Sequence, residues 1–435
     1  MGDILDPSTD RPLWVNLVEV LKSDNDFGLA FKEDYEFLMV DGRIRVSNEP
    51  EFRACLHLVW RQRYHFRLTE TGNGAYESDI TYTNPGCAGS PSWLTLDPAD
   101  DVFYCLDEGN QTPNGSVTAF KTSPDGELTV LSDHETITGQ VSSVLYGEES
   151  SRAIALAHYG GHAVSTFSVA ASNSFVPLQN ITIALEKRGP NPDRQSAAFE
   201  HQMILDPTGQ NILGPDLGAD LVRVLSIDPS TNLLSEQAAP QMPAGSGPRH
   251  AVFWSSNGDV TKGYRKNSTL FLYVVTELTN TIHGFQVAYP AAGGMDFIPV
   301  SSINTFGGAN VPQGAAAAEV SVSPDNRFVL VSNRLDKTFE FRNPDPTNST
   351  AEASDSLANF VPQPNGTLLF TQLCPAGGLH PRYFSFNKAG DLVAVALQLS
   401  DRVVIHMRDV DTGYFQWAVA AHWIEGQPTT VVWDE

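Results

Sequence analysis

Two short stretches of the chain place an arginine directly after a proline at the start of a predicted strand. Gly245–Phe253 reads GSGPRHAVF and Gly378–Phe386 reads GLHPRYFSF, so Arg249 and Arg382 stand in similar settings. A guanidinium group presents a planar fork of N–H donors that matches the oxygens of a carboxylate or phosphate. We interpret both arginines as candidates for binding an anion. The competing interpretation is that each one forms a salt bridge with an acidic residue.

The composition of the chain makes any local group of arginines informative. The 435 residues include only 27 Lys and Arg against 51 Asp and Glu, which gives a net charge of −24. Such a charge argues against nucleic acid and anionic membrane surfaces as partners. No apolar run reaches the roughly 20 residues that span a bilayer. The expected partner is therefore a small anionic molecule, with no nucleic acid and no membrane.

Residues that could transfer a proton stand at corresponding strand ends. His201 opens the segment HQMILDP, Glu277 closes LYVVTE, and Glu319 opens EVSVSPD. A histidine that titrates near neutrality and a carboxylate can share proton transfer. A single histidine at a strand end is more often structural, so the presence of His201 alone does not establish a catalytic site.

The elements that must position these residues form a repeat. Each unit has an alternating strand, a Pro-Asp-Gly or Asn-Gly type of turn, a more apolar strand, a polar turn and a third strand. The spacing of roughly 50 to 70 residues is typical of one four-stranded propeller blade. Six units are plain, and they begin at Gly89, Gly139, Phe199, Gly247, Ala317 and His380.

A seventh unit is divided between the two ends of the chain. Gln427–Glu435 has the pattern of a blade's first strand, and Cys55–Trp60 and Tyr64–Gly72 have strand character. We predict an all-β, seven-bladed propeller whose closing blade is shared by N- and C-terminal strands, which leaves no bare sheet edge. First strands line the channel of a propeller, so Arg249 and Arg382 should meet near its mouth. Arg334 ends a second strand of another blade.

The repeat also suggests how the chain is divided. Residues 51–435 are predicted to form the propeller, and residues 1–50 an N-terminal extension of unassigned role that includes a short amphipathic helix over 12–23. The polar stretches 259–269 and 343–356 are predicted to be loops inserted between strands.

The cysteines and glycosylation motifs point to opposite compartments. No signal peptide precedes the chain, which favours the cytoplasm. Cys87 and Cys105 could form a disulfide or remain two buried thiols, and Cys55 and Cys374 complete the four cysteines. Six N-x-Ser/Thr motifs favour secretion as a glycoprotein; they begin at Asn110, Asn114, Asn180, Asn267, Asn348 and Asn365.

Three segments resemble the seven-bladed propeller lactonase family, which includes 6-phosphogluconolactonases and fungal carboxy-cis,cis-muconate cyclases. They are HQMILDPTGQNILGPDLGADLVRV, GSGPRHAVF with YVVTELTNTI, and AEVSVSPDNRFVLVSNR, and the resemblance covers residues 64–435. It implies catalytic residues at His201, Arg249, Glu277 and Arg334. We add as expected substrate-binding residues Arg382, His250, Glu319 and Asp216. The chain departs from the family at Phe199-Glu200, at Leu397-Gln398 and in the insertion after Asp259, and these departures leave the substrate open.

The resemblance implies an enzyme that opens or closes a lactone on a small carboxylated or phosphorylated molecule, without cofactor or metal. Neither a GxSxG nor an HExxH motif is present. One rival is a metal-dependent lactonase using Asp216, Asp220 and Glu319. The histidines of HYGGH (158–162) could also suggest a metal site, but the glycines favour a hairpin turn. The other rival is a secreted propeller that binds a ligand without turnover.

Overall fold

The computed structural model of the chain describes residues 37–40, 43–46, 52–59, 62–72, 75–84, 86–123, 126–171, 174–185, 187–258, 268–343, 348–424 and 426–434. The chain divides into two compact units, Met1–Glu51 and Phe52–Glu435. In the first unit, β1 (Phe37–Val40) pairs with β2 (Arg43–Val46). The helix predicted over 12–23 and residues 259–267 of the predicted insertion lie outside the described residues.

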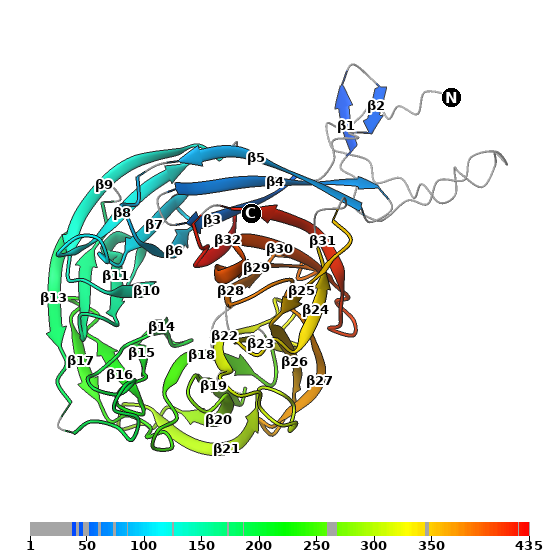
Figure 1. Cartoon of the computed structure of the whole chain (residues 1–435). Helices are drawn as coiled ribbons and strands as arrows, with labels where there is room; N and C mark the ends of the chain where they lie inside the picture. Colours follow the sequence, from blue (N-terminus) through cyan, green and yellow to red (C-terminus); the bar gives the residue numbers. More distant parts are fainter. Residues whose placement is uncertain are drawn as a thin grey trace, which may run out of the picture. The chain divides into compact units, whose positions relative to one another are not determined.

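The second unit is an all-β propeller, as predicted. Within the described residues it contains seven four-stranded antiparallel sheets, which Figure 1 shows arranged around a common centre. We number these sheets as blades 1 to 7 around the ring, beginning with the sheet that contains β6 and ending with the sheet that contains β32. No helix among the described residues is long and apolar enough to cross a membrane.

Each blade is a simple succession of strands from the centre outward. Blade 1 contains β6 (Pro91–Asp97), β7 (Val102–Asp107), β8 (Gly115–Thr122) and β9 (Leu128–Thr136). Blade 2 contains β10 (Gln140–Tyr146), β11 (Ala153–His158), β12 (Ala163–Ser168) and β13 (Val176–Thr182). Blade 3 contains β14 (Ile204–Leu205), β15 (Asn211–Asp216), β16 (Leu221–Ile227) and β17 (Leu234–Gln237). Blade 4 contains β18 (Pro248–Ser255), β19 (Leu270–Thr276), β20 (Thr281–Ala288) and β21 (Asp296–Asn304).

The remaining blades contain an insertion and a contribution from both ends of the chain. Blade 5 contains β22 (Ala316–Val322), β23 (Val329–Arg334), β26 (Ser356–Pro362) and β27 (Leu368–Pro375). Blade 6 contains β28 (Pro381–Phe386), β29 (Leu392–Leu397), β30 (Arg402–Arg408) and β31 (Phe415–Trp423). Blade 7 contains β32 (Thr430–Asp434), β3 (Phe52–Val59), β4 (Gln62–Gly72) and β5 (Ala75–Asn84). Two short 3-10 turns are η2 (Glu149–Ser151) and η4 (Gln398–Ser400).

The burial of the strands explains their sequence pattern. The second strand of a blade lies between two others and is covered on both faces, so β11 and β29 are buried at every position. A continuous apolar run is what a fully buried strand requires. The outermost strands are mostly half-buried or exposed, and β13 and β21 contain no fully buried residue. Adjacent blades pack through the faces of their inner strands; Phe271 and Tyr273 of blade 4, for example, share a core with Val329 and Phe360 of blade 5.

The prediction of a loop over 343–356 is wrong in part. β25 (Ala351–Ser354) pairs with β24 (Phe339–Arg342) in a two-stranded sheet, and Ser356 already begins β26. The residues Ala-Glu-Ala-Ser have weak strand propensity, so the hairpin arises from pairing with β24 rather than from side-chain pattern. Glu352 of this hairpin also forms an ion pair with Arg402 of blade 6.

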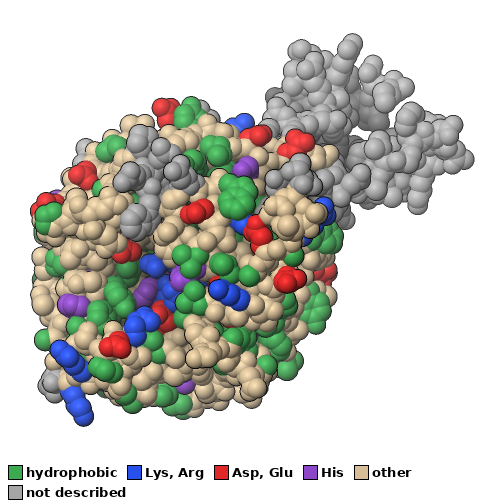
Figure 2. Space-filling model, in the orientation of Figure 1, with side chains coloured by type: hydrophobic (Ala, Val, Ile, Leu, Met, Phe, Trp, Pro, Cys, Tyr) green, Lys and Arg blue, Asp and Glu red, His purple; other side chains and the backbone are tan. Residues whose placement is uncertain are grey.

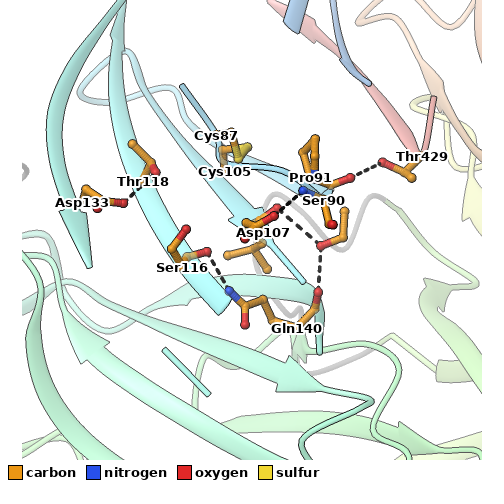
Figure 3. The surroundings of a disulfide bond; sticks show 12 residues. Cys87, Ser90, Pro91, Cys105, Asp107, Ser116, Thr118, Asp133, Gln140 and Thr429 are labelled. Atoms are coloured by element: carbon orange, nitrogen blue, oxygen red, sulfur yellow. Dashed lines mark hydrogen bonds between the residues drawn. A yellow bond between two sulfur atoms is a disulfide. The ribbon is translucent and has the colours of Figure 1, made fainter. Parts of the chain in front are cut away.

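The two ends of the described second unit lie in one sheet. β32 pairs with β3 in a register that runs from Ala54 opposite Asp434 to Leu58 opposite Thr430. The hydroxyl of Thr429, just before β32, donates a hydrogen bond of 3.1 Å to the carbonyl oxygen of Pro91 in blade 1 (Figure 3). The strand thus contacts β3 on one side and the start of blade 1 on the other.

Cys87 and Cys105 form a disulfide, which decides between the two possibilities that the sequence left open (Figure 3). The bond joins the segment before β6 to the middle of β7. Close by, a carboxylate oxygen of Asp107 accepts a hydrogen bond from the backbone N–H of Ser90. Both interactions hold the chain where it enters the first strand of blade 1.

Candidate functional site

The candidate site lies where the first strands of several blades meet. Figure 2 shows arginine or lysine and histidine side chains gathered in a hollow near the middle of the ring of blades. The contacts described below come from blades 1 to 6 and from the connection between blades 2 and 3, which are separated by up to about 300 residues of sequence. The propeller fold therefore brings together residues that have no local relationship.

The centre of the site is the carboxylate of Glu277, directly after β19. Its Oε2 lies 3.1 Å from Nε of Arg249 and 2.7 Å from Nη2 of Arg334. Its Oε1 lies 2.5 Å from Nη2 of Arg194. Burial by itself would raise the pKa of Glu277, but the charges of these three arginines outweigh burial and hold that pKa well below its usual range. Glu277 is therefore ionised at neutral pH.

Arg249 carries hydrogen-bond donors that are not used. Its side chain is 1% exposed, and its Nη1 has no hydrogen-bond partner among the described residues. Its Nε is close to Glu277 but is not aligned for a hydrogen bond. Burial, together with the charge of Arg334, lowers the pKa of Arg249. A buried charged donor without a partner is unfavourable. An anion or a polarised oxygen that accepts a hydrogen bond from Nη1 would therefore lower the free energy of the site.

The local backbone explains how the Pro-Arg motif presents its arginine. The pairing of β18 with β19 shifts register between Pro248 and His250, and that of β28 with β29 shifts between Pro381 and Tyr383. Such a bulge re-aims the extra side chain out of the regular pattern of the strand. In both blades that side chain is the arginine, so the repeated motif marks a repeated bulge.

The loop that leads to Arg249 is held by Asp220 of the β15–β16 turn. Its carboxylate accepts hydrogen bonds from the N–H groups of Gly245 at 2.6 Å and of Gly247 at 2.8 Å. Gly247 has a φ of +63°, and a Cβ at this position would lie 2.6 Å from Cγ of Leu278. Glycine is thus required here both by backbone conformation and by space.

Arg334 and Arg382 approach the same region from blades 5 and 6. Arg334 ends β23, donates to the carbonyl oxygens of Ala316 and Ala317 at 3.3 Å, and places Nη1 3.4 Å from Nε2 of His380. Arg382 lies 3.6 Å from a carboxylate oxygen of Glu108 in blade 1. Burial and then the charge of Arg334 lower the pKa of His380 to about 3.

Two histidines lie beside the arginines. The rings of His201 and His250 are 5.2 Å apart in an edge-to-face arrangement, and Nδ1 of His250 is 2.9 Å from Oε2 of Glu319. Burial and the charge of Arg249 lower the pKa of both histidines well below the usual range. Burial also raises the pKa of Glu319 to about 8, although Arg249 acts in the opposite direction. Both imidazoles are therefore neutral at pH 7.

The floor of this region is aromatic. Trp93 of blade 1 packs edge-to-face on Tyr383 of blade 6 at 5.0 Å and on His250 at 5.9 Å. Trp93 thus places apolar surface against His250, and both histidines are buried. That burial is the largest cause of their lowered pKa values.

Asp216 takes part in a different network from the one expected. Its Oδ1 accepts hydrogen bonds from the N–H groups of Phe199, Gly218 and Ala219, and its Oδ2 pairs with Arg223 at 2.7 Å. These contacts shape the turn after β15 and the chain that enters blade 3. They give Asp216 a structural part, and its predicted contact with substrate stays a prediction.

The residues considered for a metal site are likewise bound to other groups. His158 contacts Ser165 and Thr138, whereas His162 lies 2.6 Å from the carbonyl oxygen of Ala198. The HYGGH segment forms the turn between β11 and β12, as predicted. Across the described part of the chain, no group of three or more His, Cys, Asp and Glu side chains could hold a metal ion.

Several site residues were not identified from the sequence. Arg194 and Tyr159 lie in a loop and a turn without hydrophobic periodicity, so no pattern singles them out. Trp93 and Tyr383 directly follow the bulged residue of their strands, as His250 does, and that correspondence between blades is a signal that could have identified them. The same holds for His380, which directly precedes the Pro-Arg pair of blade 6.

Comparisons with known proteins identify relatives of this chain and the family to which it belongs. The chain is 28% identical to a protein of Arthroderma benhamiae named "Probable 6-phosphogluconolactonase". The alignment spans 327 residues and covers 75% of each chain. It is 24% identical over 329 residues to a 6-phosphogluconolactonase of Formosa agariphila, covering 75% of this chain and 83% of the relative. The solved structure of a periplasmic gluconolactonase of Pseudomonas aeruginosa has the same fold, with a TM-score of 0.70 and 22% identity over 88% of this chain and 99% of that one. The model of the family "Lactonase, 7-bladed beta-propeller" matches residues 65–433, and the chain belongs to that family.

Proposed function

We propose that the protein hydrolyses a lactone carried by a small phosphorylated or carboxylated molecule of the 6-phosphogluconolactone type. The observation that carries this proposal is the buried guanidinium of Arg249, whose Nη1 has no partner among the described residues and which lies beside the neutral imidazole of His201. Ester hydrolysis needs both parts, a donor for the oxygen that becomes negative and a group that removes a proton from water.

In the reaction that we propose, a water oxygen attacks the carbonyl carbon of the lactone while His201 takes the water proton. Negative charge develops on the carbonyl oxygen, and Nη1 of Arg249 donates a hydrogen bond to it. The bond from that carbon to the ring oxygen then breaks, and the proton held by His201 passes to the ring oxygen. The products are a hydroxyl group and a carboxylic acid, which loses its proton to solvent and becomes a carboxylate. One water molecule is thus consumed and one proton is released, and no other reactant is needed.

The surroundings favour His201 over Glu277 as the proton carrier. Glu277 is held ionised by three arginines, and protonating it would break three ion pairs. Its role in our proposal is to fix the positions of Arg249 and Arg334. Arg334 and Arg382 would then contact the acidic groups of the substrate. His250 would hold the ring of His201 in place through their edge-to-face contact, and Glu319 would fix His250 through its contact with Nδ1.

Independence of a metal ion is part of the proposal. The guanidinium groups supply positive charge at the developing oxyanion, which is a task that a divalent cation performs in other hydrolases. Cyclisation of a carboxylated muconate would need the same anion contacts and the same proton carrier. The two reactions differ in substrate, so a panel of substrates separates them.

The test is turnover of 6-phosphogluconolactone, gluconolactone and carboxymuconolactone, followed by proton release with EDTA present and corrected for spontaneous hydrolysis. We expect wild-type turnover of the phosphorylated lactone and a loss of about 100-fold or more in His201→Asn. Arg327→Ala, at an exposed arginine of a turn in blade 5, is the matched control and should behave as wild type. Activity lost with EDTA would favour a metal-dependent enzyme, and no turnover by wild type would favour a binding protein.

A further inference from the structure

Arg194 lies on a well-anchored part of the connection between β13 and β14. The N–H groups of Arg194 and Gln195 donate to the carbonyl oxygen of Asn191 at 3.1 and 2.7 Å. The buried amide of Gln195 donates from Nε2 to the carbonyl oxygen of Leu217 at 3.0 Å and accepts from the N–H of Asn191 at 3.1 Å. The loop is thereby attached to the β15–β16 turn, and the side chain of Arg194 begins from a fixed backbone.

The side chain of Arg194 reaches over the site from this loop. Its guanidinium pairs with Glu277 and interacts with Tyr159, and these interactions outweigh burial and raise its pKa. The ring of Tyr159 stacks on Phe199 of the same loop at 4.6 Å and lies edge-to-face on His201 at 5.4 Å. The HYGGH turn thus supports Arg194 and covers His201.

Arg194 differs from the other arginines around Glu277 in its exposure. Its side chain is 41% exposed, whereas those of Arg249 and Arg334 are 1% and 8% exposed. It is therefore the arginine of this group that a ligand arriving from solvent meets first.

The geometry of Glu277 also allows its contact with Arg194 to break while its contacts with the other two arginines remain. Arg249 and Arg334 share Oε2, and Arg194 alone among these three pairs with Oε1. If Arg194 turns away, Glu277 remains neutralised by two buried guanidinium groups. Arg194 is partly exposed but Glu277 is buried, so giving up this ion pair has a cost, which the new ion pair between Arg194 and the arriving anion offsets.

We propose that Arg194 is a substrate-binding residue that exchanges its ion pair with Glu277 for the acidic group of the substrate remote from the lactone carbonyl. Arg249 then acts on the reacting oxygen, while Arg194 selects charged over uncharged lactones. This inference rests on the proposed lactonase function for its substrate, but not for the existence of the anion site. A planar fork of donors at the rim suits a phosphate or a carboxylate equally.

The kinetic test compares 6-phosphogluconolactone with uncharged gluconolactone in wild type, Arg194→Ala and Arg194→Lys. Loss of a charge-assisted hydrogen bond is worth roughly 1.5–3 kcal/mol, so kcat/KM of Arg194→Ala for the phosphorylated lactone should fall about 10- to 100-fold, mainly through KM. The uncharged lactone should change less than about twofold, and Arg194→Lys should recover part of the loss. Arg188→Ala removes the same charge from an exposed position of the same loop and is the matched control. Equal losses for both lactones, or none, would overturn the inference.

A binding measurement separates this inference from the proposed function. Calorimetric titration with 6-phosphogluconate and with inorganic phosphate should show weaker binding by Arg194→Ala and unchanged binding by Arg188→Ala. If wild type hydrolyses no lactone but binding still depends on Arg194, the function is wrong and the anion site stands. If wild type hydrolyses the lactones and Arg194→Ala binds 6-phosphogluconate as tightly as wild type does, the function stands and the inference is wrong.

Discussion

Glu277 shows at the scale of a residue how its neighbours decide what a carboxylate can do. From the sequence, Glu277 and His201 were equal candidates for moving a proton. Three arginines around Glu277 stabilise its charged form, whereas burial and three nearby arginines favour the neutral form of His201. The charges of Arg249 and Arg334, which act on both groups, thus help to make Glu277 a fixed anion and to keep His201 neutral.

The first prediction concerns Arg249. Replacing it with Ala removes the donor proposed for the oxyanion, and such losses cost about 100- to 1,000-fold in kcat. Arg249→Lys retains the charge but not the fork of donors, so we expect it to remain well below wild type. Steady-state kinetics on the lactone checks this, with a melting curve to show that each variant is folded. Wild-type kcat in Arg249→Lys would contradict the assignment.

The second prediction concerns pH and the buried His158, which lies in blade 2 away from the arginines. Burial lowers its pKa to about 4 from an ordinary value of 6.5. Between these values the unfolded chain binds a proton that the folded chain does not, so its contribution to stability is present above pH 6.5 and lost as pH falls toward 4. His158→Gln should therefore reduce the slope of unfolding free energy against pH by about 1.4 kcal/mol per unit in this window. Urea unfolding from pH 7 to 4 measures the slope, and an unchanged slope would refute the prediction.

At the scale of elements, the bulged start of the first strand is the device that the blades share. Blades 1, 4 and 6 all shift register directly after a proline, at Pro91, Pro248 and Pro381. Proline lacks the N–H that would continue the ladder, which suits it to a bulge. The residue at the bulge is serine in blade 1 and arginine in the other two. The same type of bulge therefore presents a different side chain in blade 1 from the one that it presents in blades 4 and 6.

The third prediction concerns the Cys87–Cys105 disulfide, which encloses a loop of 18 residues in blade 1. Constraining a loop of this length stabilises a folded protein by about 3 kcal/mol. The variant Cys87→Ala/Cys105→Ala should lose about this much free energy of unfolding. Dithiothreitol should destabilise wild type similarly and leave the double variant unchanged, since Cys374 is a free thiol. Urea unfolding tests both, and wild type that is insensitive to reductant would count against the prediction.

At the scale of the whole propeller, we infer that the pairing of β32 with β3 closes the ring of blades. Val431 is fully buried in a core with Leu392 of blade 6, and the indole N–H of Trp433 donates to the carbonyl oxygen of Ser385 at 3.1 Å. The strand therefore joins the sheet of blade 7 to the face of blade 6. Closure of this kind removes exposed sheet edges, which otherwise promote aggregation.

The fourth prediction follows from this closure. Deleting residues 428–435 removes β32 and exposes the edge of β3, so we expect an unfolded or aggregated protein. Deleting Glu435 alone removes no residue of β32 and is the control. Circular dichroism and size-exclusion chromatography compare the two. A monomeric, folded protein without residues 428–435 would show that the pairing is dispensable.

The fifth prediction concerns the compartment. Four asparagines of the N-x-Ser/Thr motifs are exposed, at Asn110, Asn114, Asn180 and Asn365, and a disulfide is present. Disulfides form in oxidising compartments, where such asparagines are also glycosylated. We expect the native protein to carry N-linked glycans. Intact mass before and after peptide-N-glycosidase treatment measures them, and an unmodified mass would favour the cytoplasm.

The sequence by itself determined the repeat, the position of most strands and the arginines of the two Pro-Arg motifs. These features are local, because alternation and turn residues depend only on neighbours along the chain. It did not reveal the hairpin of β24 and β25, whose second strand has no hydrophobic pattern. Four site residues, His201, Arg249, Glu277 and Arg334, were predicted from their positions at strand ends and from the resemblance of the chain to the lactonase family.

The tertiary structure alone decided which side chains meet. Arg194 is 83 residues from Glu277 in sequence, and His250 is 69 residues from Glu319. These pairs form because the blades are arranged around one centre and one loop is attached to the next blade, and no local pattern encodes either distance. The same fold gives Asp216 hydrogen bonds within the turn after β15, which the sequence did not predict. The ionisation of Glu277 and the neutrality of the histidines follow from these long-range contacts and from burial, which only the folded chain provides.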